Sequence, residues 1–146
     1  MRIELLEKEK DLIWKSIERH PTVLVKGPSY IGITRIKETL KKYHLTQNNY
    51  EEADLIIKNN HPDIRCLDSR QLDTSEAREA KEGLSVYPAR WSHRYLILGY
   101  AEKLHNIALQ TLLKLIEEPP KHLRIFLTSE APYSLPETIF SRSILS

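Results

Sequence analysis

Cysteine is nearly absent from this sequence, and long apolar runs are absent altogether. Cys66 is the single cysteine among 146 residues, which excludes an internal disulfide and a zinc site built from several cysteines. No apolar run approaches the roughly 18 residues that a membrane-spanning helix needs. The first residues, MRIELLEKEKDL, are charged throughout and lack the apolar centre of a signal peptide. Together these absences favour a cytoplasmic protein with no membrane association.

A large net charge of either sign is also missing. The net charge is +2 and the pI about 8.6, too mild to indicate nucleic acid binding, whose usual mark is a basic patch on one face. The 6 histidines form no H-x-x-x-H or H-E-x-x-H pair, so we predict no metal site. With 40% hydrophobic and 29% charged residues, the composition is that of one soluble globular domain.

Short apolar runs alternate with amphipathic segments along the chain. The runs at 23–25, 64–67, 95–98 and 125–127 are typical of buried strands. Helical spacing of apolar residues predicts helices over 3–19, 32–43, 74–85 and 101–117, and a last helical turn from Leu135 to Arg142. Residues 51–58 fit either a helix end or a strand. This alternation predicts an α/β fold with a mostly parallel sheet and helices on both faces.

The stretch GPSYIGIT, residues 27–34, follows the first predicted strand and precedes a helix. The phosphate-loop pattern is G-x-x-x-x-G-K-[ST]; Gly27, Gly32 and Thr34 are in register, but the lysine position holds Ile33. Ile33 carries no charge and donates no hydrogen bond to a phosphate. We predict a degenerate loop that does not bind ATP productively. The alternative is a glycine-rich turn unrelated to nucleotide sites.

A phosphate-loop enzyme also needs an acidic residue at a strand end to hold Mg²⁺. After the strand at 95–98 the chain has Gly99 and Tyr100 instead of carboxylates. Glu102 follows where a helix is expected to start, and an acid there commonly complements the helix dipole. The loss of both elements predicts a nucleotide-type fold without hydrolysis and without a bound cofactor.

The later part of the chain resembles a known family. LQTLLKLIEEPP at 109–120 and LPETIFSRS at 135–143 look like the bacterial DNA polymerase III clamp-loader subunits delta-prime and gamma/tau, whose signature is roughly QNALLKTLEEPP, a strand, then LP-x-T-I-x-SRC. His61-Pro62-Asp63, Arg78 and GPSYIGIT also fall where the family has related features. The resemblance implies one AAA+ core of the P-loop type over residues 1–146. We expect the family's lid and helical collar domains to be absent.

Within this family, the loss of both nucleotide motifs indicates the non-hydrolysing delta-prime subunit. The resemblance implies that Arg142 is an arginine finger that reaches the ATP site of a neighbouring subunit. It also implies gamma/tau and delta as partners and, through them, the sliding clamp and primed DNA. Arg142 as a solvated surface residue is the simpler alternative. For the whole chain, the alternatives are a nucleotide-binding ATPase with a remodelled site and a degenerate interaction domain outside replication.

Other conspicuous residues have structural interpretations. Cys66 lies in an apolar run and is expected to fill the core rather than to act as a nucleophile. Trp91 is expected to pack, and a partner surface is the alternative. Arg90, His93 and Arg94 form a small basic cluster, interpreted as a solvated entry to a strand rather than as a DNA contact.

Overall fold

A computed structural model describes the backbone of residues 2–45, 49–142 and 144–145, and the side chains of residues 8–45 and 49–139. One sheet has the strand order β2-β3-β4-β1-β5, and each pairing in it is parallel. The strands are β1 (Thr22–Lys26), β2 (Ile64–Asp68), β3 (Arg94–Gly99), β4 (Leu123–Ser129) and β5 (Ile144–Leu145). The four predicted strands are confirmed, and β5 is an addition that the sequence did not indicate.

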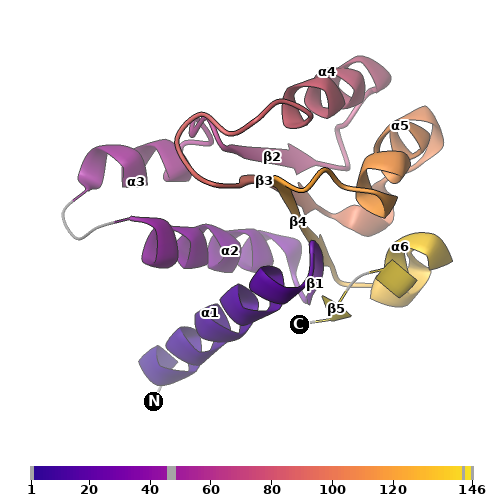
Figure 1. Ribbon diagram of the computed structural model, residues 1–146. Coiled ribbons are helices and arrows are strands. Elements are labelled where there is room, and N and C mark those ends of the chain that lie inside the picture. The colour runs from indigo at the N-terminus through magenta and orange to yellow at the C-terminus, as the bar shows by residue number, and fades with distance from the viewer. Residues whose placement is uncertain (1, 46–48, 143, 146) are drawn as a thin grey trace.

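Helices cover both faces of this sheet (Figure 1). They are α1 (Arg2–Arg19), α2 (Ser29–His44), α3 (Tyr50–Ile57), α4 (Thr74–Leu84), α5 (Asn106–Glu117) and α6 (Glu137–Arg142), with 3₁₀ turns η1 (Ala101–Lys103) and η2 (Pro132–Ser134). No helix within the described ranges is long and apolar enough to cross a membrane.

Two separate apolar cores lie on the two faces of the sheet. From β3, Leu96 and Leu98 join the core under α4 and α5, whereas Tyr95 and Ile97 join the core under α1 and α2. Successive side chains of a strand point to opposite faces, so a strand buried on both sides must be apolar at every position. The three-layer α/β architecture predicted from the sequence is therefore confirmed.

Three helix assignments become definite or change in the structure. The segment 51–58 is helical as α3, and its start is capped by Asn49, whose side chain accepts the Glu52 N–H at 3.2 Å. The single helix expected over 101–117 is interrupted, because Tyr100 and Asn106 have φ of 54° and 57°. Left-handed residues break a right-handed helix, so η1 stands apart from α5. The third revision, at the start of α2, concerns the phosphate-loop stretch.

Candidate functional site at the carboxyl end of the sheet

The strands β1 to β4 end at the same edge of the sheet because they run parallel. In open α/β sheets, ligands bind in the crevice outside this carboxyl edge. Backbone hydrogen bonds join the segments that leave it: Gly27 N donates to Ser129 O at 2.9 Å, and Ser69 N donates to Gly99 O at 3.0 Å. This edge is where the sequence places GPSYIGIT and the expected acidic residues.

The GPSYIGIT stretch is mostly helix rather than loop. Gly27 has φ of 132°, a conformation that only glycine adopts readily, and Pro28 follows as the N-cap of α2. The helix begins at Ser29, earlier than the predicted start at Gly32. Gly32 N donates to Pro28 O at 3.0 Å. In an open phosphate loop this amide would face a phosphate. Here it is bonded within the helix instead.

The other in-register residues also have structural roles in this conformation. Gly32 lies against β4, where an added Cβ would be 3.1 Å from Thr128 Cγ2, so the glycine permits close packing of α2 on the sheet. Thr34 is exposed, and its hydroxyl donates to Tyr30 O at 2.9 Å along the same helix. Its hydroxyl is thus bonded on the outer surface of α2.

Ile33, at the lysine position of the pattern, contacts the end of β3. A Cβ built on Gly99 would lie only 2.7 Å from Ile33 Cδ1. Gly99 is buried and occupies the position where an acidic residue is expected. The two positions that would hold the charged groups of a nucleotide site are thus packed against each other without charge.

Tyr100 covers the next part of the edge in a left-handed conformation. Its amide donates to Ser29 Oγ at 3.2 Å and to Thr128 Oγ1 at 3.3 Å, which joins β3 to α2 and β4. The guanidinium carbon of Arg70 lies 3.7 Å from the centre of the Tyr100 ring. Arg70 also binds Asp68, with Nη2 donating to Oδ2 at 2.8 Å, and this hydrogen bond lowers the pKa of the Asp68 carboxyl.

These residues do not fit a magnesium nucleotide. Catalysis on ATP needs open amides and a lysine at the phosphates, and a carboxylate at the metal. Ile33, Gly99 and the helical Gly32 provide none of them. Glu102, the nearest acid in the chain, has a buried Oε2 that finds no hydrogen-bond partner among the described residues. Among the residues that the structure describes, no three His, Cys, Asp or Glu side chains lie together as metal ligands.

Beside the closed loop lies a cavity of about 300 Å³ between α1 and α2. Its wall is largely apolar and includes Leu12, Ile13 and Ile31. At its rim, Arg35 Nε and Glu9 Oε2 form an ion pair at 2.9 Å. This cavity has the size to hold a small ligand.

Other predicted site residues have mixed outcomes. Arg142 is the last residue of α6, but its side chain lies outside the described residues, so the arginine-finger hypothesis stays a prediction. Lys26, the lysine just before the GPSYIGIT stretch, was not a predicted site residue; it is exposed, with Nζ 6.0 Å from the centre of the Tyr133 ring. Cys66 is half-buried, and burial raises the pKa of its thiol, as expected for a packing residue.

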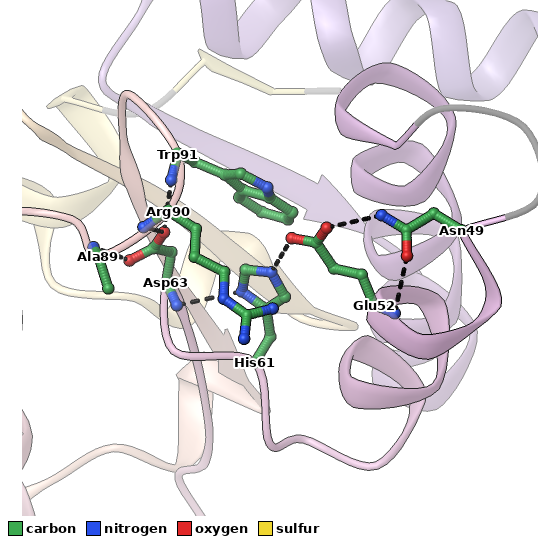
Figure 2. Close-up of polar contacts among 7 residues, drawn as sticks. All are labelled: Asn49, Glu52, His61, Asp63, Ala89, Arg90 and Trp91. Atoms are coloured by element: carbon green, nitrogen blue, oxygen red, sulfur yellow. Dashed lines mark hydrogen bonds and ion pairs between the residues drawn. The ribbon is translucent and has the colours of Figure 1, made fainter.

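A second polar cluster, at the amino end of the sheet, escaped the sequence analysis (Figure 2). Asp63, buried after the His61-Pro62 turn, accepts the backbone N–H groups of Ala89, Arg90 and Trp91 at 2.6, 2.7 and 2.7 Å. Asp63 N donates to His61 Nδ1 at 3.1 Å, so the neutral ring carries its proton on Nε2, 2.7 Å from Glu52 Oε1. The signal in the sequence was the HPD tripeptide itself.

Aromatic rings complete this cluster. The ring of Trp91 lies 4.1 Å from the rings of both His61 and His44, which confirms its packing role. His44 Nε2 is 2.7 Å from the buried Tyr95 hydroxyl. Burial, reinforced by the nearby His93 and His61, lowers the pKa of His44 to about 4.

The basic cluster at the entry to β3 is only partly solvated. The guanidinium of Arg94 donates to the carbonyls of Val86, Pro62 and Tyr87 at 2.7, 2.8 and 2.9 Å. Arg94 therefore binds the part of the loop that precedes the amides bound by Asp63. Arg94 is the first residue of β3, as the interpretation as a strand entry expected, and its half-exposed side chain also binds the loop carbonyls.

The fold and this edge define a AAA+-type core with a closed phosphate loop. The family model described as "DNA polymerase III, delta subunit" matches residues 11–145. The chain belongs to this family. It is a clamp-loader-related protein.

Relatives and solved structures agree with this assignment. The chain is 25% identical over 134 residues to DNA polymerase III subunit tau of Escherichia coli, covering 86% of this chain and 21% of the relative. It is 24% identical over 144 residues to subunit delta' of Buchnera aphidicola subsp. Baizongia pistaciae, covering 86% and 43%.

A gamma subunit-related protein of Thermotoga maritima has a similar fold, with a TM-score of 0.66 at 22% identity, over 97% of this chain and 45% of that one. The Bacillus subtilis clamp loader delta protein gives a TM-score of 0.56 at 13% identity, over 93% and 41%. The chain therefore spans less than half the length of these proteins.

Proposed function

We propose that this chain is the AAA+ core of a delta-prime-like clamp-loader subunit that does not hydrolyse ATP. Family membership supports a place in DNA replication. The observation that carries the non-hydrolysing role is the Ile33–Gly99 contact, which leaves no lysine at position 33 and no carboxylate at position 99, the two charged positions of the nucleotide motifs. On this proposal, residues 1–146 bind neighbouring subunits in the cytoplasm and help to load the sliding clamp onto primed DNA.

The proposed partners are gamma/tau and delta subunits. In such an assembly, Arg142 at the end of α6 acts in trans at the ATP site of a neighbour. A guanidinium is permanently charged and planar, and it stabilises the charge that develops on a phosphoryl group during transfer. The subunit thus contributes to hydrolysis on its neighbour without binding ATP itself.

Equilibrium dialysis with ATP and Mg²⁺ tests the non-hydrolysing role. We expect no retention of nucleotide by the natural chain at millimolar ATP, and none by the Ile33→Lys variant, because α2 still begins at Ser29 and Gly99 still supplies no carboxylate. A gamma/tau subunit run in parallel provides the positive control. Tight, Mg²⁺-dependent retention by the natural chain contradicts the proposal.

An ATPase or nucleotide binder with a remodelled site is the second candidate. The largely apolar cavity beside the loop favours it, because that cavity is large enough for a small ligand. A degenerate interaction domain outside replication is the third. Co-purification with gamma/tau separates it from the clamp-loader role: failure of the natural chain to associate with gamma/tau and delta removes the replication assignment.

A further inference from the structure

The carboxyl edge is closed by a small set of packed contacts. Ile33 comes from the second turn of α2, and Gly99 is the last residue of β3. The space beside the Gly99 Cα is taken by Ile33 Cδ1, 2.7 Å from where a Cβ would stand. Real Cβ atoms do not approach another heavy atom so closely, so a side chain at 99 and the present position of Ile33 exclude each other.

Hydrogen bonds on the neighbouring residue connect the same elements. The Tyr100 amide is shared between Ser29 Oγ on α2 and Thr128 Oγ1 on β4. Both oxygens belong to buried residues, exposed by 1% and 0%. The residue that follows β3 is therefore bound both to the first turn of α2 and to β4, next to the Ile33 contact.

In a phosphate-loop site, a nucleotide and its metal join these same two elements, because the loop binds the phosphates and the strand end binds the metal. Here the elements contact each other directly. We propose that the Ile33–Gly99 contact, with the hydrogen bonds of the Tyr100 amide, acts as a built-in substitute for the nucleotide. It holds α2 against β3 in one arrangement with no ligand bound.

This inference rests on the proposed function and explains how the edge stays ordered. It also makes the two departures from the motif interdependent. An acid at position 99 requires Ile33 to move, and removal of the Ile33 Cδ1 atom leaves Gly99 without its contact. A lysine at position 33 alone, or an acid at position 99 alone, therefore disturbs the packing without restoring a nucleotide site.

A double-mutant cycle on thermal stability, measured without nucleotide, tests this coupling. Gly99→Ala should lower the Tm of the full chain by roughly 3 °C, the low end for overpacking, since a side-chain end has to shift. Ile33→Val removes the Cδ1 atom alone. In that background, Gly99→Ala should change the Tm by less than about 1 °C, because the next nearest Ile33 atom, Cγ1, is 3.6 Å away.

Gly83 supplies the matched control. It lies in α4, and a Cβ there meets nothing within 4 Å, so Gly83→Ala should be neutral or stabilising in both backgrounds. Equal Tm losses for Gly99→Ala with Ile33 and with Val at position 33 would overturn the proposal, as would a neutral Gly99→Ala in the natural chain. Since no nucleotide is present, this result is independent of the dialysis experiment.

Discussion

His44 shows at the scale of one residue how burial selects a protonation state. The ring is packed on Trp91 and bonded to the Tyr95 hydroxyl. The titratable groups that face it are His61, His93, Glu52 and Asp63, and the histidines outweigh the carboxylates in their effect on its pKa. The neutral imidazole is thus the form that the folded protein accommodates.

This environment makes stability depend on acid. The pKa of His44 is about 4 in the folded chain, whereas the ordinary value of a histidine, which applies to the unfolded chain, is 6.5. The unfolded chain therefore takes up the proton first as the pH falls. The contribution of His44 is complete above pH 6.5 and is lost as the pH falls from 6.5 towards 4. Urea unfolding across this range should give a falling free energy of unfolding, with a shallower slope for His44→Gln.

The comparison between the two curves isolates His44. Glu52 and Asp68 also have lowered pKa values, because of hydrogen bonds from His61 and Arg70, and they reduce stability in acid in both proteins. The exposed His105→Gln variant should keep the slope of the natural chain. Parallel curves for the natural chain and His44→Gln would show that His44 titrates alike in the folded and unfolded states.

The loop before β3 shows how one buried carboxylate organises a whole segment. Asp63→Ala would leave the amides of Ala89, Arg90 and Trp91 without their acceptor. Each unsatisfied amide costs about 1–3 kcal/mol where water cannot replace the acceptor, so we expect a loss of about 3–5 kcal/mol in the free energy of unfolding. Urea denaturation measures this loss, and Asp63→Asn should fall between the two proteins.

Asp54→Ala is the control for that experiment. Asp54 is exposed on α3 and pairs with Lys58 at 3.0 Å, an arrangement worth less than about 1 kcal/mol. If Asp63→Ala cost no more than Asp54→Ala, the three hydrogen bonds to Asp63 would contribute nothing net.

Elements were predicted well where a single periodicity decides their structure. The strands β1 to β4 are continuous apolar runs because both of their faces are buried, and such runs are visible in the sequence. The start of α2 and the interruption before α5 were not visible. The start of α2 depends on the backbone of Gly27 and Pro28. The interruption depends on the left-handed backbone of Tyr100 and Asn106. The short β5 depends on pairing with Val23 and Leu24.

In the candidate site, the identities of the key residues could be predicted from the sequence, but the contact between them could not. The missing lysine and missing acid at Ile33 and Gly99 could be read by comparison with a pattern. The contact between them could not, since it joins residues from two elements that only the fold brings together. The Asp63 cluster was missed because a single buried carboxylate has no periodic signal.

At the scale of the whole molecule, the proposed role of Arg142 separates activity from stability. Arg142→Ala should leave the Tm of the chain within about 1 °C while it lowers ATP hydrolysis at the neighbouring gamma/tau site by on the order of 1000-fold. Steady-state hydrolysis by the reconstituted complex, limited to that site by inactivation of the others, provides the measurement.

Arg142→Lys separates the finger from a simple surface charge. Lysine keeps the charge but lacks the planar fork of donors, so it should recover little of the lost rate. Arg78→Ala, an exposed change on α4, should have no effect on that site. Full activity of Arg142→Ala in the complex would assign Arg142 to the solvated surface.

The aromatic cluster has a practical consequence for anyone who studies this molecule in solution. The chain has 2 tryptophans. Trp14 stacks on Tyr43 at 4.7 Å and lies 5.2 Å from His44, which in turn stacks on Trp91. The tryptophan emission of the protein therefore comes from one place. It reports changes around His44 and the Asp63 loop. Rearrangements at Ile33 and Gly99 do not change it, and their detection requires a fluorescent label attached near those residues.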